Sequence, residues 1–519
     1  MGTIGFGKAA CVIAAFCVAT AIASPAQTFT TLLSFDLADG FDPAGSLIQG
    51  ANGNLYGTTY SGGTSGNCGP DGCGTIFEIT PQGRLKTLHS FDATDGTGPT
   101  AGLVQGANGS FYGTTSEGGA KGWGTVFKIT ASGELTTLHS FCSQSSCADG
   151  RDSAGSLVQG ANGNLYGTTR EGGNVGGING CADSNGCGTV FEVTAAGNLT
   201  TIYSFCSQPG CSDGVNPTGA LVLGNDGNLY GTTFFGGSFA SAECDFGCGT
   251  VFKISSTAKL TTLYEFCSQP GCSDGIGPSA ALVLGAEGNF YGTTYWGGNF
   301  ASPQCPDGCG TVFQMTPAGR LTTLYTFCSQ TNCTDGSNPA AGVVQGTDGN
   351  FYGVTYSGGI NGNPTHCSQD SCGTVFEISP TGQFATLYSF CSQTNCIDGA
   401  NSQAALTQAT NGVFYGVAVQ GGSSSACQPG CGTIFSLSMG FGPFVETNPA
   451  FGKVGRVVGI LGSNLTGTTA VTFNGTPATF AVVSSTLIKA TVPSGATTGT
   501  IQVTTPTGTL SSNVAFQIR

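Results

Sequence analysis

The sequence is poor in charged residues, in histidine and in long apolar stretches. Only 8% of its 519 residues are charged, and it has 3 His, 3 Met and 2 Trp. So little charge excludes a highly charged disordered chain, and so few histidines leave little for an imidazole metal site. With 14 basic against 28 acidic residues the formal net charge is −14, so we expect no nucleic-acid partner.

Apolar runs are confined to the N-terminus. Lys8 precedes an apolar run over residues 9–23, and Ala21-Ile22-Ala23 offers a small-residue cleavage site. This run is short for a membrane helix, and no later segment is longer. We therefore predict a signal peptide over residues 1–26, an exported, extracellular mature chain and no membrane span.

The chain has instead abundant glycine, 88 residues, and one block that recurs seven times at intervals of about sixty residues. The sequence Asn-Leu-Tyr-Gly-Thr-Thr at Asn54–Thr59 marks the first copy. Its Tyr-Gly pair is invariant, at Tyr56, Tyr112, Tyr166, Tyr230, Tyr291, Tyr352 and Tyr415. A long and regular repeat of this kind dictates the architecture.

Each repeat contains four segments typical of short strands, here called a, b, c and d. In the first repeat they are Ser46–Ala51, Asn54–Tyr60, Gly74–Thr80 and Leu85–Phe91. The Asn-Gly pair between a and b is a strong hairpin signal. Four antiparallel strands repeated seven times predict an all-β, seven-bladed β-propeller over residues 27–440.

The two ends of the repeat region predict how it closes. The d-type strand Thr30–Phe35 precedes the first a strand, and the last repeat stops at its c strand, Gly432–Ser438. The N-terminal strand should therefore complete the seventh blade and remove two exposed edges. We expect the recurrent phenylalanines of strands c and d to pack between blades.

The tail lacks the marks of the repeat and gains Val and Thr. Six short strands are expected at Val454–Leu461, Ala470–Phe473, Ala478–Val483, Leu487–Val492, Gly499–Thr504 and Val514–Ile518. They predict a small Ig-like β-sandwich over residues 441–519.

Of the 24 cysteines, Cys11 and Cys17 fall in the predicted signal and the other 22 form close pairs. Six pairs lie in the loops between strands b and c: Cys68/Cys73, Cys181/Cys187, Cys244/Cys248, Cys305/Cys309, Cys367/Cys372 and Cys427/Cys431. Five lie in the loops between strand d and the next a: Cys142/Cys147, Cys206/Cys211, Cys267/Cys272, Cys328/Cys333 and Cys391/Cys396. Export favours disulfides over a zinc site, so we predict no metal centre.

The b–c and d–a loops should share one face of the propeller, and there the residues vary. A variable dipeptide precedes an invariant Gly-Gly after strand b, and Trp123 lies in the second b–c loop. Variable side chains on a rigid frame are typical of recognition sites, although some could fold inward as packing. The candidate ligand-binding residues are Tyr60, Glu117, Trp123, Arg170, Glu171, Phe234, Phe235, Tyr295, Trp296 and Tyr356.

The d–a loops also repeat an Asp-Gly pair, at Asp39, Asp95, Asp149, Asp213, Asp274, Asp335 and Asp398. Calcium binding by the aspartate oxygens is one interpretation of these pairs, and a local turn before the glycine is the alternative. Few residues suit catalysis: His89 and His139 occupy one packing position, His366 is isolated in a cysteine loop, and Glu117 and Glu171 form the one conceivable carboxylate pair. We assign no catalytic residue.

The run Asn-Leu-Tyr-Gly-Thr-Thr…Gly-Gly…Gly-Thr-Val-Phe resembles the bacterial GloVer (Gloeo/Verruco) tandem repeat in all seven copies. The stretches Gly459–Leu465, Val471–Gly475, Ala490–Pro493 and Gly499–Pro506 resemble the IPT/TIG immunoglobulin-like domain. The first resemblance implies export but no known activity. The chain ends at Phe516–Arg519 without a sorting motif or apolar tail, which leaves open whether it stays at the cell surface.

These features predict a secreted binding or adhesion protein whose loop face recognises a glycan or a protein. The alternatives are a carbohydrate-active or esterase-like propeller enzyme and a purely structural envelope protein. The sequence alone does not choose among them.

Overall fold

The computed structural model describes residues 27–173, 186–238, 244, 246–298, 300, 302–362, 367 and 371–519. The described chain is all β, with short 3-10 turns as its helices: η1 (Ser145–Cys147), η2 (Pro209–Cys211), η3 (Pro270–Cys272), η4 (Thr331–Cys333) and η6 (Thr394–Cys396). In this part of the chain no helix has the length and apolarity needed to cross a membrane. The predicted signal peptide, Cys181 and His366 lie outside the described residues.

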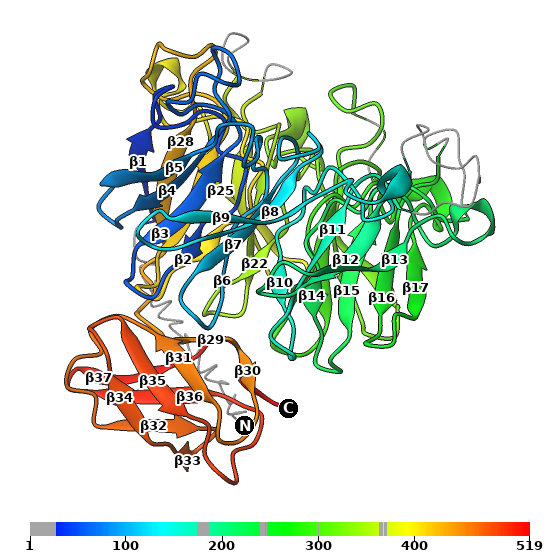
Figure 1. Cartoon of the computed structure of the whole chain (residues 1–519). Helices are drawn as coiled ribbons and strands as arrows, with labels where there is room; N and C mark the ends of the chain where they lie inside the picture. The colour runs from blue at the N-terminus through cyan, green and yellow to red at the C-terminus, as the bar shows by residue number, and fades with distance from the viewer. Residues whose placement is uncertain are drawn as a thin grey trace, which may run out of the picture.

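Each repeat forms one four-stranded antiparallel sheet, as predicted (Figure 1). The a strands are β2 (Ile48–Gln49), β6 (Val104–Gln105), β10 (Val158–Gln159), β14 (Val222–Leu223), β18 (Val283–Leu284), β22 (Val344–Gln345) and β26 (Thr407–Gln408). The b strands are β3 (Leu55–Thr59), β7 (Phe111–Thr115), β11 (Leu165–Thr169), β15 (Leu229–Thr233), β19 (Phe290–Thr294), β23 (Phe351–Thr355) and β27 (Phe414–Ala418).

The c strands are β4 (Thr75–Ile79), β8 (Thr125–Ile129), β12 (Thr189–Val193), β16 (Thr250–Ile254), β20 (Thr311–Met315), β24 (Thr374–Ile378) and β28 (Thr433–Ser438). The d strands are β5 (Leu85–Ser90), β9 (Leu135–Ser140), β13 (Leu199–Ser204), β17 (Leu260–Glu265), β21 (Leu321–Thr326), β25 (Phe384–Ser389) and β1 (Thr28–Ser34). The a strands are shorter than predicted, and residues before them line a cavity that all seven repeats share.

The first and last strands of the repeat region pair as the sequence predicts. Strand β1 lies antiparallel to β28, with Phe29 opposite Leu437 and Thr31 opposite Phe435. The sheet of repeat 7 therefore has the order β26-β27-β28-β1, and its outermost strand comes from the other end of the region. This pairing gives β28 a partner on the side that would otherwise be a bare edge.

Phenylalanine contacts join each sheet to the next. The Phe that ends a d strand meets the c-strand Phe of the following repeat edge-on at 5.1–5.4 Å between ring centroids. The pairs are Phe35/Phe77, Phe91/Phe127, Phe141/Phe191, Phe205/Phe252, Phe266/Phe313, Phe327/Phe376 and Phe390/Phe435. All are buried, so the prediction that these rings pack between sheets is confirmed.

Small side chains and backbone from all seven repeats line one cavity of about 290 Å³. Its wall includes Ala44, Ala101, Ala154, Gly219, Ala280, Ala341 and Ala404. The sheets thus share an axis. At one end lie the b–c and d–a loops, here called the loop face, and at the other the a–b and c–d turns, here called the turn face.

The tail forms a separate pair of sheets. One has the order β29 (Glu446–Asn448), β31 (Val457–Leu461), β35 (Leu487–Thr491), β34 (Phe480–Val482), and the other β33 (Thr476–Pro477), β32 (Ala470–Phe473), β36 (Ile501–Thr505), β37 (Gly508–Ser511). Strands β30 (Phe451–Gly452) and β38 (Gln517–Ile518) pair in parallel. Buried side chains of both larger sheets, such as Ile460, Phe473 and Val503, form one core.

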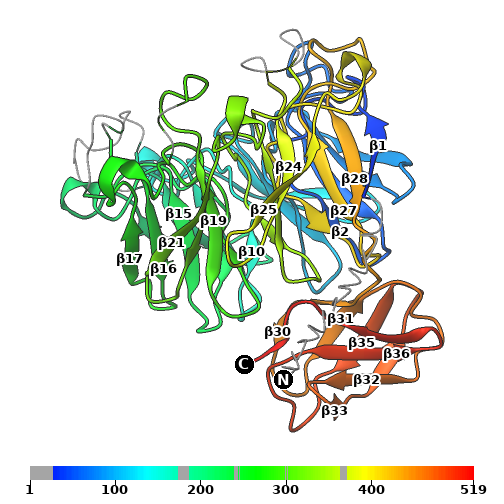
Figure 2. The same cartoon turned by 180° about the vertical axis from the view of Figure 1, so that it is seen from behind.

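The tail lies against the turn face, below the first repeats in Figure 1 and again in the reverse view of Figure 2. Hydrogen bonds hold it there: Thr486 Oγ1 donates to Ala51 O at 2.8 Å, and Arg519 Nη2 to Gly224 O at 2.7 Å. The opposite end of the repeat region remains uncovered by the tail.

Candidate functional site

The variable dipeptides share one backbone frame on the loop face. In every repeat the second dipeptide residue forms an antiparallel bridge with a residue of the preceding d–a loop. These bridges are Phe41/Ser61, Thr97/Glu117, Arg151/Glu171, Val215/Phe235, Ile276/Trp296, Ser337/Ser357 and Ala400/Gln420. The frame is therefore constant around the axis while its side chains change.

The next residue of each d–a loop links neighbouring repeats. At all seven of these positions φ lies between 54° and 63°, in Asp42, Gly98, Asp152, Asn216, Gly277, Asn338 and Asn401. Asn, Asp and Gly tolerate this left-handed conformation best. Asn338 donates its side-chain amide to Tyr295 O at 3.1 Å, and Asn401 donates to Tyr356 O at 2.8 Å, each in the preceding repeat.

Each left-handed residue lies two positions before the first residue of its repeat that lines the shared cavity. The seven dipeptides and the left-handed residues therefore lie at the loop-face end of this cavity, and this region is here called the mouth. Repeats 1–3 give it a charged half. Arg170 Nη1 lies 3.3 Å from Asp152 Oδ2, and Arg151 Nη2 lies 2.9 Å from Glu171 Oε2. Among the described residues, no arginine pairs with the carboxylates of Asp42 and Glu117.

The environment of Tyr60 and Asp42 is anionic and partly dehydrated. Burial raises the pKa of the Asp42 carboxyl to about 6, and among the described residues no donor reaches its oxygens. Burial, followed by the negative charges of Glu117, Asp42 and Asp152, raises the pKa of Tyr60. Glu117 thus lies near Tyr60, whereas Glu171 is held by Arg151, so the two glutamates are not two equivalent free carboxylates.

Repeats 4–6 give the mouth an aromatic half. Phe234 lies 4.7 Å from Phe235 and 5.3 Å from Trp296 between ring centroids, and Tyr295 lies 5.3 Å from Trp296. Phe246, from the b–c loop of repeat 4, lies 6.3 Å from Phe235 and is 52% exposed. Burial first, and then the electrostatic effect of Tyr356, raises the pKa of Tyr295.

Some candidate rings fold over glycine in the next repeat. A Cβ at Gly98 would lie 2.8 Å from the ring of Tyr60, and one at Gly277 would lie 3.1 Å from the ring of Phe234. Tyr60 and Phe234 therefore partly cover the frame rather than standing free. Trp123 is 41% exposed, and the guanidinium of Arg151 lies 4.2 Å above its ring.

Sequence reasoning missed Asp42, Asp152, Arg151 and Phe246. The first three come from d–a loops, which the sequence places far from the dipeptides of the same repeat. The sequence does contain a signal for Asp42, Arg151 and Asp152: each lies two or three residues after the aspartate of an Asp-Gly pair, at a fixed position in the repeat. Their approach to the dipeptides depends on the bridges described above.

Three overlapping segments, residues 21–205, 177–435 and 241–509, match the model of the Gloeobacter/Verrucomicrobia repeat. The chain belongs to the Gloeobacter/Verrucomicrobia repeat family. No significant match is found among curated proteins.

Solved structures similar to this family member are distant from it in sequence. A fungal alcohol oxidase of the AA5 family in complex with copper has 12% identity and a TM-score of 0.48, over 95% of this chain and 98% of its own. The extracellular domain of a protein assigned as a hybrid two-component system from B. thetaiotaomicron has 11% identity and a TM-score of 0.45, over 95% and 59%. A luciferin-regenerating enzyme has 12% identity and a TM-score of 0.36, over 66% and 93%.

Disulfides hold the loop face of this Gloeobacter/Verrucomicrobia repeat protein. Ten of the predicted pairs are bonded, in both b–c and d–a loops. Cys181 lies outside the described residues. In repeat 5 the sulfurs of Cys305, Cys309, Cys328 and Cys333 all lie within 4.8 Å of one another, so the two loops of that repeat pack through their disulfides.

The two members of each b–c cysteine pair have different surroundings. Both lie between strands b and c, as predicted, and the second member is buried in the core. Cys73 is bonded to Cys68 and Cys431 to Cys427, as predicted, yet both Cys73 and Cys431 are fully buried. The equivalent cysteines of other repeats are at most 1% exposed: Cys187, Cys248, Cys309 and Cys372.

The physical reason is that the second cysteine lies where the loop already rejoins the sheet, one residue before the Gly that leads into strand c. Cys73 packs in the core with Phe91 and Phe127, and its carbonyl oxygen accepts a hydrogen bond from Gly98 N at 3.1 Å. The carbonyl oxygen of Cys431 accepts likewise from Asp42 N of repeat 1 at 3.3 Å. These cysteines therefore anchor one repeat to the next and do not face a ligand.

The Asp-Gly aspartates organise the same loops. Asp149 is fully buried, accepts hydrogen bonds from the backbone of Ser143 and Gln144, and lies 2.9 Å from His139 Nε2. In repeats with Tyr at the histidine position, the tyrosine hydroxyl donates to the aspartate instead, as Tyr203 does to Asp213 at 2.8 Å. The oxygens that a calcium ion would use are thus engaged by the chain's own donors, and His89 likewise contacts Asp95.

Proposed function

We propose that this protein is an exported binding or adhesion protein whose mouth recognises a glycan or a protein ligand. The observation that carries the proposal is the division of the mouth into a charged half in repeats 1–3 and an aromatic half in repeats 4–6. Both halves use the same backbone frame, so the side chains can vary without a change of fold. Partly exposed rings next to carboxylates and guanidinium groups offer stacking and hydrogen bonds to one ligand.

The finer architecture belongs to the same proposal. The circle of phenylalanine contacts, the pairing of β1 with β28 and the shared cavity support a seven-bladed β-propeller closed by its N-terminal strand. The two tail sheets around one core support an Ig-like domain of the IPT/TIG type. The disulfides and the N-terminal apolar run support export through a signal peptide.

Glycan-array binding of the mature protein tests the function. We expect a hit that weakens at least about tenfold in Trp296→Ala and in Phe235→Ala, because aromatic anchors dominate such contacts. Glu117→Gln tests the charged half, and Glu134→Gln, in an exposed turn of the turn face, is its matched control. A hit that no mouth variant weakens would place recognition elsewhere, and no hit on glycans or on a protein library would favour a structural envelope role.

One observation favours a second candidate, a secreted hydrolase. Burial raises the pKa of Asp42 to about 6, and the carbonyl oxygen of Asp42 accepts a hydrogen bond from Tyr60 N at 2.9 Å. A carboxyl whose pKa is raised toward neutrality is suited to general acid–base catalysis. Turnover of a polysaccharide panel that disappears in Asp42→Asn while binding persists would establish it, whereas binding without turnover in the unmodified protein would reject it.

A further inference from the structure

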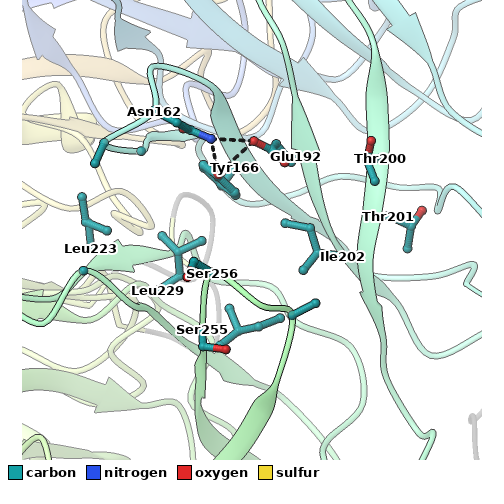
Figure 3. Close-up of a pocket in the computed structure, with 15 residues that line it drawn as sticks. Asn162, Tyr166, Glu192, Thr200, Thr201, Ile202, Leu223, Leu229, Ser255 and Ser256 are labelled. Atoms are coloured by element: carbon teal, nitrogen blue, oxygen red, sulfur yellow. Dashed lines mark hydrogen bonds between the residues drawn. The ribbon is translucent and has the colours of Figure 1, made fainter.

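A second cavity opens on the turn face between repeats 3 and 4, at the end of the repeat region opposite the mouth. It has a volume of about 460 Å³ and lies between sheet β10–β13 and sheet β14–β17 (Figure 3). Cavities of this size accommodate small organic ligands. Its walls include Ile202, Leu223, Leu229 and Ile254, and its polar groups include Tyr166 and Glu192.

The cavity uncovers a tyrosine that every other repeat buries. The signature tyrosines at 56, 112, 230, 291, 352 and 415 are at most 3% exposed. Tyr166 is partly exposed instead. The interface between repeats 3 and 4 therefore differs from its equivalents.

A missing aromatic partner is one part of the difference. Four signature tyrosines contact a Phe that opens the b strand of the next repeat, at 3.8–4.3 Å between ring centroids, as Tyr291 contacts Phe351. Tyr166 faces a repeat that has Leu229 at this position. This change alone does not open an interface, because Tyr112 meets a repeat that has Leu165 there and is still only 3% exposed.

The second part is an alanine in place of glycine. In five repeats the c–d turn contains a left-handed Gly, where an added Cβ would lie only 2.4–2.8 Å from a carbonyl oxygen of the preceding d strand. These glycines are Gly83, Gly133, Gly197, Gly319 and Gly382. Repeat 4 has Ala258 there, with a φ of 63°.

Ala258 therefore acts as a spacer. Its methyl group cannot approach the preceding strand as closely as glycine does, since a real Cβ is not found at such distances from a carbonyl oxygen. The c–d turn of repeat 4 keeps the same internal bond, from Ala258 N to Ser255 O at 2.9 Å. Because the turn keeps its internal hydrogen bond, we infer that the turn lies farther from β13 than its equivalents do from their d strands. The space between the turn and β13 is part of the cavity.

The chemistry of the cavity is apolar with one anionic end. Glu192 Oε1 accepts hydrogen bonds from Asn162, Asn164 and Tyr166 at 2.6–2.9 Å. Although burial opposes it, these bonds lower the pKa of Glu192 and keep it ionised. Glu192 is the charged residue among those that line the cavity, and Oε2 accepts no hydrogen bond from the described residues.

We propose that this cavity is a binding site for a small amphiphilic cation, an aryl-alkyl ammonium, whose apolar ring fills the space beside Leu229 and Ile254 and whose ammonium group binds Glu192. The apolar walls exclude water from the ring, and the uncompensated carboxylate selects the positive charge. The site is independent of the mouth, which faces the other end of the molecule.

Ligand-observed NMR titration of the mature protein with 2-phenylethylamine tests the site. We expect saturable binding in the millimolar range or tighter, and binding at least about tenfold weaker for 3-phenylpropanoate, which has a similar ring and the opposite charge. Equal binding of the two compounds, or no binding of the amine, would overturn the proposal.

Three variants localise the binding. Ala258→Gly and Leu229→Phe restore what other repeats have and should close or fill the cavity, so each should reduce amine binding at least about tenfold without loss of folding. Glu192→Gln should do the same, and the fold tolerates it because Gln314 occupies this position in repeat 5 and donates to Tyr291 Oη at 2.6 Å. Binding that survives these variants but is lost in Trp296→Ala would assign the amine to the mouth and refute the second site.

Discussion

Replacing Phe35 by alanine tests whether the sheets close on themselves. Phe35 follows β1, which belongs to the sheet of repeat 7, yet its ring meets Phe77 of repeat 1 at 5.3 Å. The side chain is fully buried. Removing a buried Phe from a core costs about 3–5 kcal/mol, the lost transfer free energy together with the cavity that remains.

The matched control is Phe91→Ala. Phe91 is equally buried, and its ring meets Phe127 at 5.4 Å between repeats 1 and 2, an interface that no terminus forms. In a closed arrangement the two interfaces are equivalent, so both variants should lower the free energy of unfolding by similar amounts, about 3–5 kcal/mol. In an open arrangement Phe35 would lie at a free end and its loss would cost far less.

Urea unfolding measures the free energy of unfolding of both variants. An unchanged slope of this free energy against urea concentration shows that the unfolding transition itself is the same. Amide hydrogen exchange in β28 adds a local readout, because Phe435 and Leu437 lie opposite β1 residues and should exchange faster in Phe35→Ala. A cost below about 1 kcal/mol for Phe35→Ala, beside the full cost for Phe91→Ala, would refute closure through β1.

Three further outcomes are expected. Thr433 Oγ1 is buried and has no hydrogen-bond partner among the described residues, since repeat 7 has Ala418 where other repeats have Thr. Ala418→Thr should therefore stabilise the protein by about 1 kcal/mol in thermal unfolding, and Ala418→Val should not. Burial raises the pKa of Asp42 from 3.8 to about 6, so the free energy of unfolding should fall as the pH rises through that range and the carboxyl ionises. Asp42→Asn should remove this fall, and an unchanged dependence of stability on pH in that variant would contradict the assignment. Breaking the Cys142–Cys147 bond should cost about 2 kcal/mol, read as the difference between Cys142→Ser and unmodified protein in unfolding without reductant.

Much of the repeat fold could be predicted from local patterns. Period-two alternation and the Asn-Gly turns predicted four strands per repeat, and the unpaired d-type strand near Thr30 predicted the partner of β28. The tail was predicted less completely: β29, β30, β33 and β37 were missed. They are two to four residues long, too short to show alternation.

The loops show a second limit. Repetition of aspartate with glycine indicated a turn, but not that Asp149 and Asp213 would be fully buried beneath His139 and Tyr203. The sequence places these partners ten residues apart, and their contact depends on how the loop folds back onto strand d. Spacing likewise paired Cys73 with Cys68 but did not reveal its burial, which depends on the neighbouring repeat. The roles of the predicted ligand-binding residues remain predictions.

The sequence by itself determined the repeat, its strands, its disulfide pairs and the frame that carries the dipeptides, because these depend on contacts within one copy or between identical copies. Only the tertiary structure decided which unlike side chains meet: that Arg151 pairs with Glu171 and Arg170 with Asp152, and that Ala258 separates two sheets. Such features depend on which unlike side chains meet across an interface. The methyl group of Ala258 matters because a carbonyl oxygen of the preceding repeat's d strand lies close to this position, and no local sequence pattern reveals that contact.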